Sequence, residues 1–492
     1  MDAEEAINFF TENIESGQGK SAMALLGTPG TSLFVDLGGT AVWGQKWVPS
    51  QGRHFAVAGA AGTGILWEVF ANKTKISRGN VAIPNGPVTM ACNPTQLLIC
   101  SGGLLYIFTF STNVLAAVAS PPFGKVAQVD YSDGFFIATQ SSPAAIALSN
   151  INDGTVWAGT AISTISLFPD NLVSMKVIQS QIVLNGNTKS TVYQNAGVPL
   201  FPFQPVSGAV IEHGAWAQNA TVVLDSSVMW LQADDRGQLV AMRNSGYNAV
   251  RISNHAMEQW WQSFPIANDA IGYSLQINGH PWWHLYFPTA NLACRYDVST
   301  QMWHKVLAWD TNNGTWVAHQ SQNHADAFGK HLLGAWDSGH INETSMPTYT
   351  GGSWNFCTDD GSVLRRIRRT PYIQTETQRI FHNRLQFELQ TGLGPIPSLT
   401  DNAGNPRPPQ LTVRWSDDGA RTWSNDHPVN CGAAGEYTAR AFVTRLGSTL
   451  HGRVYEADMS DPIPWYFSDA YLDADPAFKP SQRLADRLKG VA

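Results

Sequence analysis

The sequence predicts an all-β protein: a β-propeller of about six or seven blades with an additional C-terminal antiparallel β-region. Short apolar segments recur along the 492 residues, and Gly, Asp, Asn or Pro separate them. Turn-forming residues are abundant, with 43 Gly and 27 Pro, and helical periodicity is nearly absent before the C-terminal end. Strands at such short spacing indicate a sandwich, a barrel or a propeller, and blade-like repetition favours the propeller.

The composition restricts the class of function. Charged residues make up only 14% of the chain, against roughly 25% in ordinary soluble domains. Such sparse charge indicates an outer surface that is covered in an assembly, although many β-propellers and secreted β-proteins are also poor in charge. The net charge of −7 argues against a globally basic DNA-coating protein. It is compatible with a DNA conduit, because phosphate contacts would hold a sliding polyanion back.

The cysteines and the N-terminus indicate the cellular compartment in which the chain folds. The five cysteines form no CxxC pair and predict neither a zinc site nor a disulfide framework; they are Cys92, Cys100, Cys294, Cys357 and Cys431. We expect buried thiols in a chain that folds in a reducing cytoplasm. The acidic N-terminus lacks the pattern of a secretory signal. No run approaches 18 apolar residues, so membrane insertion is not expected.

Four regions follow along the chain. Residues 1–40 are predicted to dock on neighbours or on the sheet, and residues 41–350 to form the propeller, in which residues 293–306 resemble an outer blade hairpin. Residues 351–475, after Thr350-Gly351-Gly352, are predicted to form antiparallel strands, either a separate β-domain or the closing part of the propeller. Residues 476–492 are predicted to form a tail with a short amphipathic helix over 481–490.

The segment 222–261 combines several local signals. Its first strands, around Val222 and Trp230, are too apolar for a solvent-facing ribbon. Asp234, Asp235 and Gly237 predict a tight reversal, because Gly tolerates positive φ and Asp bonds its own backbone. Ser253 or Asn254 is then expected to cap a short helix over residues 255–262.

The order of these elements resembles a signature of the tail hub, or packaged-DNA stabilisation, family of short-tailed bacteriophages. The resemblance extends over most of the chain through short segments in the family's order: Ile7-Asn8-Phe9-Phe10-Thr11-Glu12, Thr28-Pro29-Gly30, Ala147-Leu148-Ser149, Gly154-Thr155-Val156-Trp157, Arg251-Ile252-Ser253-Asn254-His255-Ala256-Met257-Glu258, Thr358-Asp359-Asp360-Gly361, Arg368-Arg369-Thr370-Pro371 and Thr391-Gly392-Leu393-Gly394.

The resemblance implies a structural virion protein of the tail, assembled in the host bacterial cytoplasm. It implies a homohexameric ring, or nozzle, that closes the channel below the portal and adaptor, retains packaged DNA and conducts it during ejection. Its implied partners are the portal-adaptor protein, tail fibres, spikes or a tail needle, and double-stranded DNA passing through the channel. No catalytic residue, cofactor or metal comes with the resemblance.

A motif near the C-terminus resembles an Asp-box at Ser416, Asp418, Thr422 and Trp423. We expect a structural turn, in which Asp accepts backbone N–H groups and Trp packs under the hairpin; Ala420, where Gly is usual, alters or strains it. Because Asp-boxes also occur in sialidase propellers, the alternative function is a carbohydrate-binding or glycoside-hydrolysing propeller in host receptor recognition. No pair of carboxylates stands out for such hydrolysis.

Two further groups are candidates for contacts. The only basic cluster comprises Arg365, Arg366, Arg368 and Arg369, which are expected to line a DNA channel, to bind acids of a neighbouring subunit or to lie on an ordinary solvated strand. The aromatic pairs, predicted to lie in exposed loops that anchor partner proteins or else in the blade core, are Trp260, Trp261, Trp282 and Trp283.

The histidines predict no metal site. His280 and His284 lie in a predicted strand, where positions i and i+4 are about 13 Å apart, too far for one ion. The remaining candidates, His319, His324 and His331, are scattered over a polar loop-strand region.

Overall fold

The computed structural model describes residues 4–14, 22–60, 62–84, 86–165, 170–233, 237–375 and 378–476. Two compact units divide the chain. We call residues 31–303 and 316–345 the propeller unit. Residues 1–30, 304–315 and 346–492 are the sandwich unit. The predicted turn at Asp234 and Asp235 and the predicted helix over 481–490 lie outside the described residues.

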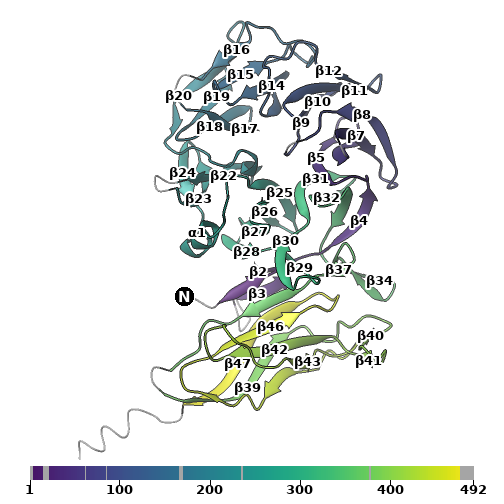
Figure 1. Ribbon diagram of the computed structural model, residues 1–492, viewed down its shortest axis with the longest axis vertical. Coiled ribbons are helices and arrows are strands. Elements are labelled where there is room, and N and C mark those ends of the chain that lie inside the picture. Colours follow the sequence, from purple (N-terminus) through teal and green to yellow (C-terminus); the bar gives the residue numbers. More distant parts are fainter. Residues whose placement is uncertain are drawn as a thin grey trace, which may run out of the picture. The chain divides into compact units, whose positions relative to one another are not determined.

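The propeller unit is a ring of four-stranded sheets (Figure 1). Each of its first five blades is formed by four consecutive strands. The first blade contains β5 (Ala41–Val48), β6 (Arg53–Ala60), β7 (Thr63–Val69) and β8 (Lys75–Val81), and the second contains β9 (Thr89–Cys92), β10 (Gln96–Ser101), β11 (Leu104–Thr109) and β12 (Val114–Ala117). The third contains β13 (Val129–Ser132), β14 (Phe135–Gln140), β15 (Ala145–Leu148) and β16 (Ile162–Thr164), the fourth contains β17 (Leu172–Ile178), β18 (Gln181–Gly186), β19 (Ser190–Asn195) and β20 (Phe203–Ile211), and the fifth contains β21 (Val222–Leu224), β22 (Ser227–Ala233), β23 (Leu239–Ser245) and β24 (Asn248–Arg251).

Two further blades complete the ring, which gives seven within the described residues. The sixth is built from β25 (Ile271–Ile277), β26 (His280–Phe287), β27 (Leu292–Asp297) and β28 (Met302–Lys305), whose end crosses the unit boundary. The seventh joins strands from both ends of the propeller sequence: β31 (Ser321–Ala327), β32 (Lys330–Ala335), β33 (His340–Thr344) and β4 (Thr31–Asp36). β4 pairs antiparallel with β33, with Val35 opposite Ile341, and so closes the ring.

Hydrophobic cores fill the spaces between neighbouring blades. In the described residues, six such cores draw alternating apolar residues from the facing sheets of two neighbouring blades, and one of them joins the seventh blade to the first. Stacking the blades therefore buries both faces of the inner strands, as in other closed β-architectures. This explains why strands such as β22 are nearly continuous apolar runs.

The 222–261 segment forms the whole fifth blade and the helix that follows it. Helix α1 (His255–Gln262) begins as predicted, and the Asn254 side chain caps it by accepting a hydrogen bond from the Met257 N–H at 2.9 Å. Ser253 has another role: its hydroxyl accepts from the Ala241 N–H of β23 and donates to the buried Glu258. A 3-10 turn, η1 (Gln218–Ala220), precedes the blade.

The sandwich unit consists of two antiparallel sheets around one core. One sheet runs β2 (Phe9–Asn13), β3 (Met23–Gly27), β47 (Tyr466–Pro476), β39 (Ile380–Leu389) and β44 (Ala441–Thr444), with β45 (Ser448–Thr449) also on β39. The other contains β1 (Glu5–Ile7), β38 (Arg366–Arg369), β46 (Val454–Met459), β42 (Gln410–Ser416) and β43 (His427–Asn430). Phe9, Leu385 and Phe467 of the first sheet pack with Val413 and Met459 of the second.

The chain's N-terminal strands are thus integral to the sheets of the sandwich unit, where β1 pairs with β38 and β3 with β47. Short hairpins complete the unit: β34 (Thr348–Thr350) with β35 (Ser353–Asn355), β36 (Thr358–Asp359) with β37 (Ser362–Val363), and β40 (Leu399–Thr400) with β41 (Pro406–Arg407). The remaining strands β29 (Leu307–Asp310) and β30 (Thr315–Ala318) form a ribbon of their own.

Candidate functional site

Three arginines of the predicted basic cluster lie on β38, between β1 and β46 in one sheet of the sandwich unit, and Arg365 directly precedes the strand. Arg366 is fully buried, and its guanidinium donates to the backbone carbonyl of Thr28 at 3.0 Å. Burial lowers the pKa of Arg366 from its usual value. Gly27 leaves room for this side chain, because a Cβ there would lie 2.5 Å from the Arg366 Nε. The strand position was predicted, but the sequence did not indicate burial of a guanidinium.

Carboxylates of the same unit hold the other three guanidinium groups. Arg365 binds Asp458 at 2.5 Å and lies 4.1 Å above the Trp309 ring. Arg369 binds the fully buried Glu456 at 2.6 Å and Glu5 at 3.0 Å.

Arg368, which keeps a third of its side-chain surface exposed, pairs with Glu4. Arg414 completes the network by binding Glu456 at 2.5 Å. Burial raises the pKa of the Asp458 carboxyl, and the facing Arg365 offsets this only in part.

This arrangement limits what the cluster presents to other molecules. Its charge is largely neutralised within the sandwich unit, so β38 does not offer a row of uncompensated cations. The predicted role of Arg365, Arg366, Arg368 and Arg369 in a DNA channel or a subunit interface stays a prediction. Arg368, the most exposed of the four, is the residue best placed to test it.

Three of the short family-like motifs meet around this strand. The Thr28 carbonyl of the Thr-Pro-Gly segment accepts from Arg366, and a Cβ on Gly30 would lie 2.2 Å from the Thr358 carbonyl oxygen. Thr370, after Arg368 and Arg369, accepts from the Tyr455 N–H at 3.0 Å through its hydroxyl. These contacts show that the motifs position strands of the sandwich unit.

The prediction of exposed aromatic loops is corrected for three of the four tryptophans. Trp282 and Trp283 lie in strand β26 and are fully buried, and Trp261 on α1 is 1% exposed. The Trp283 indole donates to the Ala220 carbonyl at 3.1 Å. Trp260 is half-buried and packs edge-on against Phe264 at 5.0 Å. The alternative of a blade core holds for the buried three: stacked blades cover both faces of β26, and Trp261 packs from α1 into the core between the fifth and sixth blades.

The Asp-box residues form the expected turn. One Asp418 carboxylate oxygen accepts from the Ser416 hydroxyl and from the Arg421 and Thr422 N–H groups, and the other from the Thr422 hydroxyl at 2.7 Å. These hydrogen bonds, led by that of the Thr422 N–H, lower the pKa of Asp418. Ala420 has a φ of 71°, the left-handed region that favours glycine.

Trp423 completes this turn by lying under two guanidinium groups, those of Arg414 at 4.8 Å and Arg369 at 5.1 Å. The side-chain oxygens of Ser416, Asp418 and Thr422 all form hydrogen bonds within the turn. The Asp-box therefore gives no specific support to glycoside hydrolysis.

A polar groove of about 620 Å³ lies on the propeller unit beside the fifth blade. Its described lining includes Ser227, Ser253 and Tyr296, and a single carboxylate, Asp225. Asp225 forms an ion pair with Arg243 at 2.7 Å. Glycoside hydrolysis by the common mechanisms requires two carboxylates across the scissile bond, so this groove lacks the required pair.

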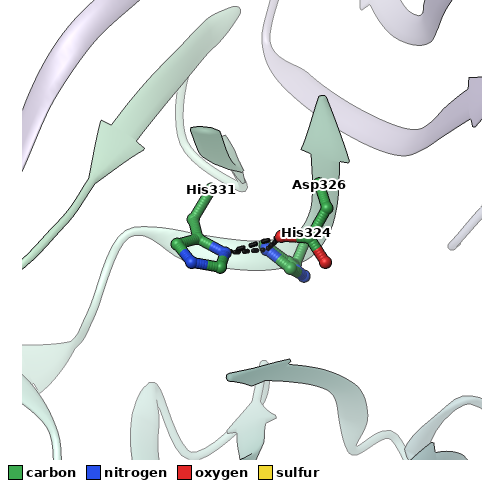
Figure 2. A group of neighbouring side chains, drawn as sticks. All are labelled: His324, Asp326 and His331. Atoms are coloured by element: carbon green, nitrogen blue, oxygen red, sulfur yellow. Dashed lines mark hydrogen bonds and ion pairs between the residues drawn. The ribbon is translucent and has the colours of Figure 1, made fainter. Parts of the chain in front are cut away.

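His324, Asp326 and His331 come together on the seventh blade, although the sequence showed them as scattered (Figure 2). The His331 Nδ1 lies 2.6 Å from an Asp326 oxygen, and the His324 Nε2 lies 3.3 Å from both of these atoms. Hydrogen bonds from His324 and His331 lower the pKa of the Asp326 carboxyl. Two imidazole nitrogens and one carboxylate oxygen form a donor set suited to a metal ion.

Of the other candidate histidines, His280 and His319 form side-chain hydrogen bonds, and the buried His284 on β26 stacks on Tyr273 at 4.7 Å. His280 lies on strand β26, as predicted, with its Nδ1 2.7 Å from an Asp297 oxygen. His319 lies 2.7 Å from the Ser321 hydroxyl. All five cysteines are free thiols, of which Cys92 is half-buried and the others are buried. Among the described residues, no helix is long and apolar enough to cross a membrane.

Comparison with known proteins bears on the family. The solved structures that resemble the chain include the designed Ika8 protein (11% identity, 64% of this chain and 100% of that chain, TM-score 0.39). Others are YCF48 from Cyanidioschyzon merolae (11%, 64% and 98%, 0.41) and U3-55K (10%, 62% and 96%, 0.39). No curated protein matches.

Two family profiles match the sequence itself. The profile described as "Bacteriophage P22 Gp10, beta-propeller" covers residues 6–343, and "Bacteriophage P22 Gp10, beta-sandwich" covers residues 365–475. The order of these profiles is that of the two architectures in the structure, a propeller followed by a sandwich. With more than half of its length matched by the first profile alone, the chain belongs to the bacteriophage P22 Gp10 family of structural DNA-stabilisation proteins of the phage tail.

Proposed function

We propose that the chain assembles into a six-fold ring, the nozzle that closes the portal–tail channel. In this role it retains the packaged genome in the virion and conducts it during ejection. The observation that carries the proposal is family membership over both architectural units, residues 6–343 and 365–475. A structural role in the phage tail follows from membership of that family.

The charge distribution supports a conduit over a DNA-coating protein. The chain has 31 basic and 38 acidic residues. In the basic cluster, the side chains of Arg365 and Arg369 are compensated by Asp458 and Glu456. Each uncompensated cation that met a phosphate would release counterions and add affinity, so a wall of paired charges favours sliding over retention by adhesion. Retention in this proposal comes from closure of the channel.

The proposed partners are other copies of the chain, the portal-adaptor protein, and tail fibres, spikes or a needle. The proposed site of action is the virion tail, with assembly in the host cytoplasm before the tail is complete. Double-stranded DNA is a passing occupant of the channel in this proposal, and no membrane insertion is part of it.

The first test is the native mass of the purified chain, alone and mixed with the portal-adaptor protein of the same virus. We expect a ring of about six chains that forms or tightens with the adaptor. Electron microscopy of the same sample would display a central channel. A 53.6 kDa monomer that ignores assembled portal–adaptor complexes would contradict the proposal.

A second test addresses DNA retention. Particles assembled without the chain should lose their packaged DNA, and added purified protein should prevent the loss. Arg368→Glu, which reverses the most exposed charge of β38, should impair ring formation or ejection if that strand contributes. Arg421→Glu makes the same charge change at an exposed position of the Asp-box turn and serves as the control. Particles that retain DNA equally well without the chain would overturn the stabilising role.

A further inference from the structure

The cluster on the seventh blade follows from the register of one hairpin. In β31, His324 and Asp326 are two residues apart and so share a face of the sheet. In β32, His331 stands directly opposite Asp326. The three side chains therefore converge from two adjacent strands, as Figure 2 shows. A shift of either strand by one residue would turn its side chains to the other face and separate the group.

The distances between the donor atoms are close to those of ligands around a small cation. Zinc–nitrogen and zinc–oxygen bonds are about 2.0–2.2 Å, so neighbouring ligand atoms in a tetrahedral site are roughly 3.3–3.5 Å apart. The His324 Nε2 lies 3.3 Å from the His331 Nδ1 and 3.3 Å from the Asp326 oxygen. The third edge, 2.6 Å between the His331 Nδ1 and the Asp326 oxygen, is shorter than this spacing and must widen when the ion binds; the Asp326 side chain is 69% exposed.

The surroundings fix part of the cluster and leave part of it open. The His324 side chain is only 6% exposed, and its ring lies 6.2 Å from that of Tyr273 and 5.4 Å from that of His331. His331 is 28% exposed. A cation here would have one ordered imidazole beneath it and solvent on the Asp326 side, where water would fill the remaining coordination positions.

A hydrogen bond between His331 and Asp326, without any metal ion, is a competing explanation for the close approach of these side chains. With the His331 Nδ1–H donating to Asp326, one hydrogen bond satisfies that pair, and the nearby His324 ring stacks on His331. This explanation needs no metal ion and predicts no metal affinity. The two explanations therefore differ in whether all three side chains bind one added ion together.

We propose that His324, Asp326 and His331 bind a divalent transition-metal cation of the Zn²⁺ type. The two imidazole nitrogens favour such an ion over Mg²⁺ or Ca²⁺, which prefer all-oxygen sites. Bound there, the ion cross-links β31 to β32 in the blade that β4 closes through β33. Its role is structural: it stabilises the closing blade by mass action, because it binds the folded hairpin and not the unfolded chain. The site is independent of the proposed function.

The test uses the full chain, treated with a chelator and dialysed, and Zn²⁺ alone as the probe. Isothermal titration should show one Zn²⁺ per chain with a dissociation constant on the order of micromolar. Co²⁺ as a second probe should give visible absorption bands of a site with nitrogen ligands. Zn²⁺ should raise the unfolding temperature by roughly 3 °C.

Two conservative variants at the accessible positions, Asp326→Asn and His331→Gln, should each weaken Zn²⁺ binding by about tenfold or more and abolish the thermal shift. His255→Ala removes a 91%-exposed imidazole of the same unit and should leave binding unchanged. Both test positions are partly exposed, so the metal-free variants should fold, and circular dichroism checks this. Absence of Zn²⁺ uptake, or wild-type affinity in both variants, would overturn the proposal in favour of the hydrogen bond without a metal ion.

Discussion

The propeller and the sandwich differ in how far apart in the sequence the strands joined by a buried ion pair lie. In the first propeller blade the buried Glu68 of β7 binds Arg53 of β6 and Arg78 of β8, which are consecutive strands, and the buried His54 is neutral, with its pKa lowered to about 3 by burial. In the sandwich the fully buried Glu456 of β46 binds Arg369 of β38 and Arg414 of β42, which come from distant parts of the chain.

The difference follows from how each unit brings its strands together. Six of the seven propeller blades form from consecutive hairpins, so their strands pair with neighbours in the sequence, and apolar packing joins one blade to the next. The sandwich joins strands from both ends of the chain, such as β3 and β47. We infer that its buried ion pairs select the pairing of these distant strands, since a mispaired sheet would leave charges buried and unpaired.

The largest expected effect is in the propeller core. Trp261→Ala should cost about 4 kcal/mol of unfolding free energy, because it empties a site between the rings of Trp303 and Phe287. Trp260→Ala, one residue away on α1 and half-buried, should cost about 1 kcal/mol. Denaturant unfolding measures the loss of unfolding free energy in each variant, and hydrogen exchange of the β26 amides reports whether the loss affects the core. Equal costs would contradict the assignment of Trp261 to the core.

A slightly smaller loss is expected in the sandwich. Glu456→Gln removes the charge shared by two guanidinium groups and should cost about 3 kcal/mol, with the loss of hydrogen-exchange protection concentrated in β46 and β38. Glu388→Gln, the same change at an exposed position of β39, is the control and should be near neutral. A neutral Glu456→Gln would show that the network does not select the pairing.

The stability of the protein should fall in acid because of the buried, neutral His54 of the propeller. The folded-state pKa of His54, about 3, is below the unfolded value near 6.5, so its destabilisation is absent above pH 6.5 and grows as the pH falls. Between pH 7 and pH 5 the wild-type protein should lose about 2 kcal/mol from this residue. His54→Phe should remove that loss. An unchanged pH dependence of unfolding in the variant would contradict a buried neutral imidazole.

The smallest effect concerns the Asp-box turn. Ala420→Gly should stabilise the sandwich by about 0.5 kcal/mol, because glycine relieves the left-handed φ of 71°, partly offset by the greater freedom of the unfolded chain. Gly419→Ala, at the neighbouring position with a φ of 76°, should be destabilising. Thermal unfolding measures the stability change in each variant. Destabilisation by Ala420→Gly would show that the turn is not strained.

The sequence by itself determined the features that depend on a few neighbouring residues. The all-β class, helix α1 with a cap at Ser253 or Asn254, and the Asp-box hydrogen bonds of Asp418 all follow from local patterning and short-range backbone bonding, and the structure selects Asn254. The order of short motifs was likewise sufficient to identify the family. These features were predictable because the groups that form them are within a few residues of one another.

Only the tertiary structure decided the rest. Closure of the seventh blade by β4, burial of Arg366 under the Thr28 carbonyl, and burial of Trp282 and Trp283 all involve segments far apart in the chain. The convergence of His324 and His331 required the register of a hairpin, because a shift of one residue reverses every side chain. Periodicity shows that a strand exists, whereas its partners and register depend on the free energy of the whole fold.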